Sequence, residues 1–248
     1  MSRNFELMQQ LEIDSSPAVA DTFQPAFVEL EKVNGRVERN GWASDEALGL
    51  VQRIFLPQTQ NSPRMVVFSG VNPGDGCTGI SASVAETLAK NGFGPVCIVE
   101  ANFRSPTLPV LFGTKNQRGL ADALLRDGPI RSFAKPLGSD SLWLLSCGAH
   151  AQHSANLLSS ERIKSRLAEL RDEFALVIID TPALMRYADA IAIGQLADGV
   201  VLVLEAATTR REAAQLAVST LRSAKIPILG AVLNKRTFPI PEPIYKRL

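Results

Sequence analysis

Short runs of apolar residues alternate along this chain with longer segments of helical periodicity, and this alternation restricts the fold more than any other feature. The runs are apolar at every position, which is typical of strands buried on both faces. Strands that alternate with helices favour a mostly parallel sheet. We therefore predict an α/β domain with a mostly parallel, twisted sheet and helices on both faces. The predicted strands are residues 65–68, 96–99, 142–145, 176–179, 200–204 and 228–233, and the predicted helices are residues 44–55, 78–91, 119–126, 160–173, 186–196 and 209–224.

Length and composition set the outer limits of the protein class. The 248 residues suit one α/β domain, predicted over residues 43–248, after a partly ordered N-terminal arm over residues 1–42. The net charge of +1 provides no electrostatic footprint for nucleic acid. No apolar run approaches the roughly 18–20 residues of a membrane helix, so we predict no direct membrane insertion. The odd count of 3 cysteines indicates a reducing compartment and a cytoplasmic protein.

A glycine-rich segment follows the first predicted strand and opens the next predicted helix, which is the setting of a phosphate-binding loop. Its glycines let backbone amides turn inward toward phosphate oxygens, and the helix N-terminus adds a partial positive charge. The hydroxyl of Thr78 stands where this motif has a magnesium ligand. The alternative is a glycine turn without a ligand. The predicted nucleotide-contacting residues of the loop are Pro73, Gly74, Asp75, Gly76, Cys77, Thr78 and Gly79.

Cys77 occupies the position at which phosphate-binding loops carry a lysine. A lysine there makes a charge-assisted contact to the terminal phosphates, worth roughly 1.5–3 kcal/mol. Catalysis should lose more than binding, because the same charge stabilises the transition state. A thiol at a helix N-terminus is also expected to have a lowered pKa, which would make it reactive. The favoured alternative is a small residue that fills the vacated lysine position.

Acidic residues follow two of the predicted strands, at the edge where nucleotides bind to parallel sheets. Asp180 ends a run of apolar residues, which is the Walker B pattern, and would hold magnesium together with Thr78. Glu100 and Asn102 follow the second predicted strand, and Arg104 comes two residues later. Asp180 could instead cap a turn, and Arg104 could be a surface residue.

The helix over residues 209–224 has a predicted capping box at its start. Thr209 and Glu212 have the spacing at which a threonine side chain bonds the helix amides and a glutamate reaches back. We therefore expect Thr209 to be the N-cap residue of this helix.

Taken together and in order, several motifs resemble those of one family. They are Pro-Gly-Asp-Gly at 73–76, Arg-x-Pro at 104–106, Leu-Leu-Ser-Ser-Glu-Arg at 157–162, Ile-Ile-Asp-Thr-Pro at 178–182, Ala-Asp-Gly-Val at 197–200 and Val-Leu-Asn at 232–234. The chain resembles the cytoplasmic bacterial tyrosine autokinases of capsule and exopolysaccharide synthesis, which are relatives of the MinD and ParA ATPases. The resemblance covers roughly residues 44 to 236 and implies a P-loop NTPase-like fold that binds ATP or ADP with magnesium. It also implies that Asn234 lies near the adenine.

The chain departs from this family in four functional parts, the loop lysine and three others, while Thr78 and Asp180 are retained. The family has Asp-x-Asp where this chain has Glu100 and Asn102, and Asn102 cannot supply the charge of a magnesium-binding aspartate. The family's ring-forming helix has two arginines where this chain has Gly49 and Gln52. The family ends in a tyrosine cluster, whereas this chain has only 2 tyrosines, Tyr187 and Tyr245.

These departures predict a pseudokinase or weakly active regulator of polysaccharide polymerisation or export, with ATP, ADP and magnesium bound weakly or not at all. It would act through a transmembrane co-polymerase or activator partner at the inner face of the membrane, and it could self-associate. One alternative is an active tyrosine autokinase in which Arg104 or a neighbour's basic residue replaces the lysine and Tyr245 is the acceptor. Another is a MinD/ParA-like ATPase switch, which Val71, Asn72 and Pro73 disfavour because those relatives carry a lysine there.

Overall fold

The computed structural model describes residues 26–31, 42–56, 62–149, 157–158 and 160–236. The strands are β1 (Ala26–Glu31), β2 (Met65–Gly70), β3 (Val96–Glu100), β4 (Lys135–Leu137), β5 (Ser139–Leu145), β6 (Leu176–Thr181), β7 (Gly199–Glu205) and β8 (Ile228–Arg236). The helices are α2 (Trp42–Phe55), α3 (Cys77–Lys90), α4 (Leu108–Leu111), α5 (Leu120–Leu125), η1 (Ile130–Phe133), α6 (Glu161–Glu173), α7 (Asp189–Gly194) and α8 (Arg211–Ser223).

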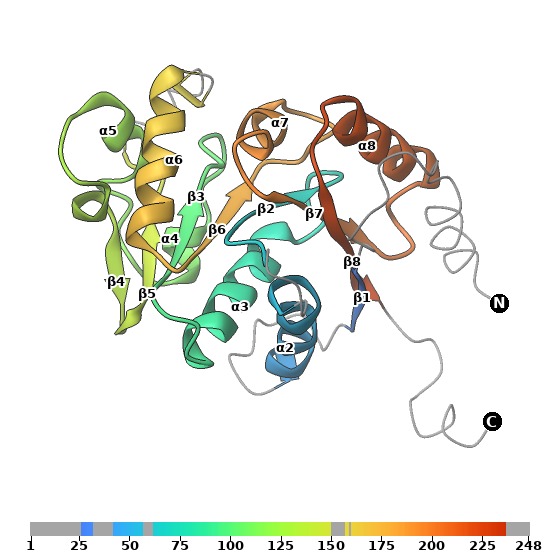
Figure 1. Ribbon diagram of the computed structural model, residues 1–248. Coiled ribbons are helices and arrows are strands. Elements are labelled where there is room, and N and C mark those ends of the chain that lie inside the picture. The colour runs from blue at the N-terminus through green and yellow to red at the C-terminus, as the bar shows by residue number, and fades with distance from the viewer. Residues whose placement is uncertain (1–25, 32–41, 57–61, 150–156, 159, 237–248) are drawn as a thin grey trace.

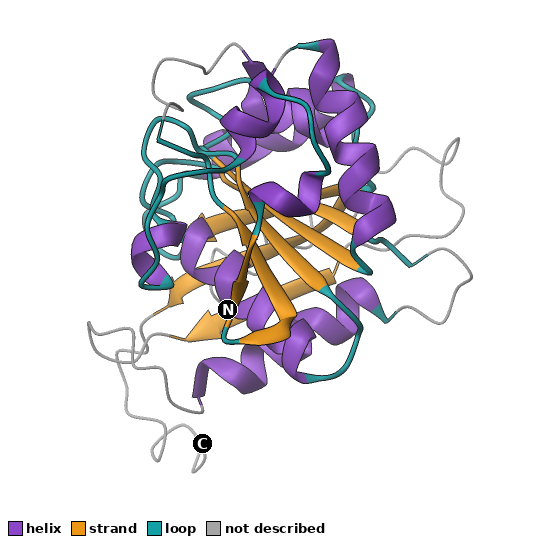
Figure 2. Cartoon of the chain, turned by 90° about the vertical axis from the view of Figure 1, so that its left-hand side faces the viewer, coloured by secondary structure: helices purple, strands orange, loops and turns teal. Residues whose placement is uncertain are grey.

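The strands form one 8-stranded sheet in the order β1-β8-β7-β2-β6-β3-β5-β4. Every pairing is parallel except that of β4 with β5. The sheet lies between two layers of helices, with α2 and α3 on one side and α5, α6, α7 and α8 on the other (Figures 1 and 2). The predicted α/β fold with a mostly parallel sheet is therefore confirmed.

The central strands are apolar at nearly every position because their side chains pack alternately into two cores, one on each face of the sheet. On β2, Met65 and Val67 pack in the cluster that also contains α5, α6, α7 and α8. Val66 and Phe68 alternate with them and pack in the cluster formed with α2 and α3. A strand that is covered on both faces cannot shift by one residue without exchanging its two sets of core side chains.

Elements of the structure differ from the sequence prediction in a few places. Strand β1 lies in the segment assigned to the N-terminal arm and pairs with β8 at one edge of the sheet. Strand β4 and the short helix α4 were not predicted, because segments of 3 and 4 residues carry too little periodicity. The predicted capping box is wrong, since α8 starts at Arg211 and the N-cap position is Arg210.

A carboxylate fastens the start of the central strand β2 to its neighbours. Asp198 Oδ2 accepts hydrogen bonds from the backbone amides of Arg64 (2.7 Å) and Met65 (2.8 Å) and from Arg171 (3.0 Å). Burial alone would raise the pKa of Asp198, but the bonds from Arg171 and from the two amides outweigh it and lower this pKa. Asp198 therefore joins α6 to β2 and β7 at the end of the sheet where these two strands begin. The loop that follows β2 lies at the opposite end of the strands.

The Asp198→Ala substitution should lower the free energy of unfolding by about 1–3 kcal/mol, because it leaves two amides and a guanidinium without their acceptor. Urea denaturation at pH 7 measures this loss. Since the folded pKa is lowered, the stabilisation is present above the unfolded pKa of about 3.9 and disappears as the pH falls through the folded value. The matched control is Asp172→Ala, at an exposed position of α6, which should change stability by less than about 0.5 kcal/mol. Equal losses for the two variants would contradict this role of Asp198.

Candidate functional site

The loop between β2 and α3 forms a turn that only glycine adopts without strain at two positions. Gly74 has a φ of 91° and Gly76 a φ of 86°, both in the left-handed region. A Cβ at Gly76 would also lie 2.2 Å from the Asn234 side chain, so another residue type would clash there. The backbone of the loop thus has the compact form expected for phosphate binding, and α3 begins directly after it at Cys77.

Side chains from β8 hold the outer side of this loop. Asn234 Nδ2 donates to the carbonyl of Asp75 at 2.8 Å. Lys235 Nζ donates to the carbonyl of Gly74 and forms an ion pair with Glu205 at 2.8 Å. The loop is therefore fastened to the ends of β7 and β8, and the Asn234 amide that the resemblance places near an adenine contacts the loop backbone.

The carboxylate of Asp75 holds the loop from within. Asp75 is only 2% exposed, and its Oδ2 accepts a hydrogen bond from the backbone amide of Asn72 at 2.7 Å. Its Oδ1 accepts from Thr209 Oγ1 at 3.3 Å, while Thr209 itself accepts from the amide of Glu205. Thr209 thus links the loop to β7 and is not free to cap α8. Burial is the main cause that raises the pKa of Asp75.

Thr78 and Asp180, the predicted magnesium ligands, lie in direct contact. Thr78 Oγ1 donates to Asp180 Oδ2 at 2.7 Å, and the Cys77 thiol lies near the same carboxylate. Burial raises the pKa of Asp180 to about 6, although the bonds from Thr78 and Cys77 oppose this shift. The structure thus brings the first turn of α3 against the end of β6, as the two sequence motifs predict.

The Cys77 thiol has a raised pKa, and the expectation of a lowered pKa is wrong. Although the residue keeps part of its surface exposed, burial of the thiol raises its pKa well above the ordinary value, and the Asp180 carboxylate raises it further. Burial and the Asp180 carboxylate both disfavour the thiolate, and together they outweigh the partial positive charge of the helix N-terminus. The Cys77 thiol is therefore neutral.

Glu100 lies beside Asp180, because the parallel register pairs these two residues across β3 and β6. It is fully buried, and its Oε2 accepts hydrogen bonds from the backbone amides of Thr107 (3.0 Å) and Leu108 (2.7 Å). Burial and, second, the Asp180 carboxylate raise the pKa of Glu100 to about 8. Glu100 therefore anchors the start of α4, and it carries a proton at neutral pH.

Two buried carboxylate oxygens have no hydrogen-bond partner among the described residues, Glu100 Oε1 and Asp180 Oδ1. Oxygen donors of this kind suit a hard divalent cation, and the Thr78 hydroxyl lies against the same carboxylate. These residues therefore fit a magnesium ion. Within the described ranges, no group of three or more His, Cys, Asp and Glu side chains forms a metal-binding cluster.

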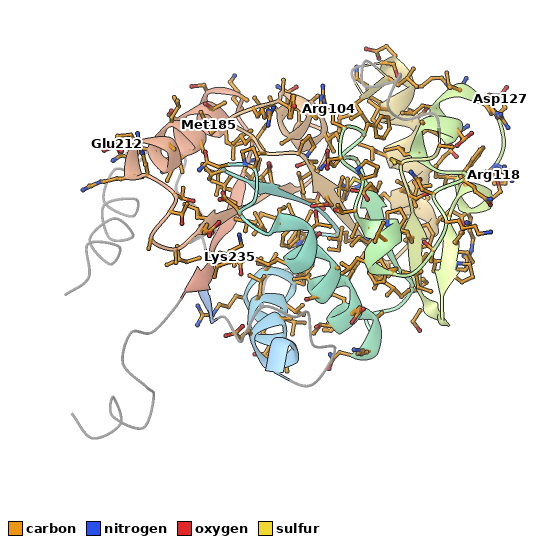
Figure 3. All side chains as sticks on the ribbon, turned by 180° about the vertical axis from the view of Figure 1, so that it is seen from behind. Arg104, Arg118, Asp127, Met185, Glu212 and Lys235 are labelled. Atoms are coloured by element: carbon orange, nitrogen blue, oxygen red, sulfur yellow. The ribbon has the colours of Figure 1, made fainter. Side chains whose placement is uncertain are left out.

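Asn102 and Arg104 point to partners other than the loop. Asn102 Oδ1 accepts a hydrogen bond from the amide of Ser105 at 3.2 Å. Arg104, labelled in Figure 3, forms an ion pair with Asp189 at the start of α7. Its guanidinium carbon lies 4.0 Å from the centre of the Tyr187 ring. Arg104 thereby joins the loop after β3 to the segment after β6, and its contact with a phosphate stays a prediction.

Several residues of the site escaped the sequence analysis. They are Lys235, Glu205, Thr209, Asp189 and Tyr187, each of which acts on a partner far away in the sequence. Of these residues, only Lys235 could have been found from the sequence, because it directly follows Asn234, which was a predicted site residue.

Several solved structures share the fold of this chain. The crystal structure of the chimerical protein CapA2B2 has a TM-score of 0.76 and 21% sequence identity, over 86% of this chain and 95% of that one. The kinase domain of the Escherichia coli tyrosine kinase ETK has a TM-score of 0.74 and 20% identity, over 88% and 92%. MinD from Pyrococcus horikoshii, complexed with Mg-ADP, has a TM-score of 0.61 and 19% identity, over 74% and 76%. These similarities concern the fold.

The sheet order, the glycine loop between β2 and α3, and Asp180 near the end of β6 give this chain a P-loop NTPase-like fold, which it shares with MinD. No protein-family profile matches the chain. Tyrosine-protein kinase YwqD of Bacillus subtilis is 32% identical over 181 residues, which are 73% of this chain and 76% of YwqD. This chain belongs to the bacterial tyrosine-protein kinase family. Tyrosine-protein kinase Wzc of Salmonella typhimurium is 29% identical over 179 residues, and this chain spans only 24% of that longer relative.

The Glu100→Gln substitution should remove a pH dependence of stability. Since the folded pKa of about 8 lies above the unfolded value, the folded state retains a proton, and stability falls as the pH rises toward 8. One such group gives a slope of up to about 1.4 kcal/mol per pH unit. Asp180 adds to the slope only up to about pH 6. Glutamine keeps the acceptor for Thr107 and Leu108 without titrating, so its curve should be flat between pH 6.5 and 8.

Urea unfolding in the presence of a chelator, measured every half pH unit, provides this comparison. Glu212→Gln, at an exposed position of α8, is the matched control and should retain the slope of the unmodified chain. Parallel curves for the chain and Glu100→Gln above pH 6.5 would contradict a raised pKa of Glu100.

Proposed function

We propose that this chain is a pseudokinase, or a weakly active kinase, that regulates polysaccharide polymerisation or export. The observation that supports this proposal most directly is the environment of Cys77. The position that carries the loop lysine in active relatives holds a thiol, which burial and the nearby Asp180 carboxylate keep neutral. The loop retains its form and its backbone amides, while the charge that stabilises phosphoryl transfer is missing.

The magnesium end of the site supports the same proposal. Thr78 and Asp180 remain in contact, so they could hold a magnesium ion that would neutralise charge on the terminal phosphates of a nucleotide. Glu100 uses Oε2 to accept hydrogen bonds from the start of α4, which leaves Oε1 as its one oxygen for a cation, and Asn102 bears no charge. ATP or ADP with magnesium would therefore bind weakly, with the loop amides as the main contacts.

A membrane partner is part of the proposal. Among the helices of the described ranges, none is both long and apolar enough to cross a bilayer. A relative of Klebsiella pneumoniae, 24% identical over 186 residues, is named as a putative tyrosine-protein kinase of the cps region. We propose a cytoplasmic protein that reaches the inner face of the membrane through a transmembrane co-polymerase or activator, and that regulates this partner with or without nucleotide.

The alternative of an active autokinase draws support from the intact Thr78–Asp180 contact. It needs a cation that replaces the lysine, and the guanidinium of Arg104 is paired with Asp189. Incubation of the full chain with ATP and magnesium, followed by phosphotyrosine detection, separates the two hypotheses. We expect no incorporation. Autophosphorylation that disappears in Asp180→Ala would overturn the pseudokinase proposal.

Restoring the lysine should strengthen nucleotide binding. Isothermal calorimetry with ADP and ATP, with and without magnesium, should show weak or undetectable binding to the unmodified chain. The Cys77→Lys variant should bind about 10- to 100-fold more tightly, since one charge-assisted contact is worth roughly 1.5–3 kcal/mol.

The control for this gain is Cys77→Ala, which removes the thiol without adding a charge and should leave the affinity low. A magnesium-dependent affinity of the unmodified chain in the low micromolar range or tighter would contradict the proposal.

A further inference from the structure

Tyr187 lies on the segment between β6 and α7, close to the candidate site in the sequence and outside its phosphate-binding loop. It is half-buried, so part of the side chain reaches the surface. It is the only tyrosine among the residues that the structure describes, and Tyr245 is the other tyrosine of the chain. Nothing in the proposed nucleotide site requires a tyrosine at this position.

Two arginines flank the Tyr187 ring. The guanidinium carbon of Arg104 lies 4.0 Å from the ring centre and that of Arg186 lies 5.5 Å from it. A cation–π contact of this kind stabilises an exposed site by about 0.5–1 kcal/mol. The two contacts therefore contribute little to the stability of the protein. Arg186 is exposed, whereas Arg104 also pairs with Asp189. The two arginines next to the ring and the one carboxylate paired with Arg104 therefore leave a net positive charge beside Tyr187.

A phosphate on the phenol oxygen would find this charge in reach. Phosphotyrosine carries a charge of about −1.5 to −2 and three strong acceptor oxygens, and guanidinium groups bind such oxygens in pairs. Arginine side chains rotate freely enough to move from the ring face to a group at its end. The phosphate would compete with the single negative charge of Asp189 for Arg104.

We propose that Tyr187 is a phosphorylation site, and that Arg104 and Arg186 bind the phosphate once it is attached. The phosphoryl donor is a nucleoside triphosphate, and the catalyst is a competent tyrosine kinase acting in trans. The phenol oxygen forms a bond to the γ-phosphorus, the bond to the β–γ bridging oxygen breaks, the phenol proton is released, and the diphosphate leaves. This inference is independent of the proposed function, because the chain is the substrate.

Phosphorylation of the full chain by an active bacterial tyrosine kinase, with ATP and magnesium, tests the site. Peptide mapping by mass spectrometry should place a phosphate on the peptide with Tyr187. In the Tyr187→Phe variant, the amount of phosphate on that peptide should be at least tenfold lower than in the unmodified chain. In the Tyr245→Phe variant, it should be unchanged. Phenylalanine keeps the ring against both arginines, so folding is preserved. Phosphate found only on Tyr245, or on neither tyrosine, would overturn the proposal.

A ³¹P NMR titration of the phosphorylated chain tests whether the two arginines bind the phosphate, because it measures the second pKa of the phosphate. Two guanidiniums within reach should lower the second pKa of the phosphate, ordinarily about 6, by about one unit. The double variant Arg104→Gln and Arg186→Gln should restore the ordinary value. Arg222→Gln, at an exposed position of α8, is the control and should keep the lowered one. An unshifted titration of the phosphorylated, unmodified chain would contradict phosphate binding by these arginines.

Discussion

The parallel pairing of β3, β6 and β2 is the constraint on which the rest of the structure depends. It places Glu100 beside Asp180 and Phe68 beside Asp180, so the carboxylates and the phosphate-binding loop meet at one edge of the sheet. Both faces of these strands are filled by core side chains, which prevents a shift of register. The geometry of the site is therefore a property of the core, and a substitution in the loop such as Cys77 leaves it in place.

The acidic groups at the end of β3 and β6 all have raised pKa values, which lowers the negative charge that they carry. Burial raises the pKa of Glu100 to about 8 and that of Asp180 to about 6, and the Cys77 thiol is held neutral. A lysine at position 77 would place a positive charge beside Asp180 and favour its ionised form. The raised pKa of Glu100 has causes of its own, first the burial of the side chain and second the Asp180 carboxylate that faces it across β3 and β6.

The sequence predicts most of this site because the local patterns and the fold agree. The continuous apolar runs predict the strands, and the positions directly after them identify Asp180 and the loop. What it could not predict are contacts between distant segments, such as Lys235 with the loop or Arg104 with Asp189. The Thr209 prediction failed for the same reason, since a tertiary bond to Asp75 replaced the local cap. Strand β1 was missed because an edge strand over 6 residues depends on pairing with β8.

Side chains of β8 hydrogen-bond to the carbonyls of the loop, so the shape of the loop and the charge needed for catalysis come from different residues. Asn234 and Lys235 fasten the carbonyls of Asp75 and Gly74, and the amides of the loop are the groups that we propose to contact phosphate. In an active kinase the loop lysine contributes both affinity and transition-state charge, so its loss reduces both. The bonds that brace the loop come from Asp75 within it, from Thr209 and from β8, and none of them involves the side chain of residue 77. A family member could thus lose the transfer chemistry at Cys77 and keep a shaped, weakly binding loop as part of its scaffold.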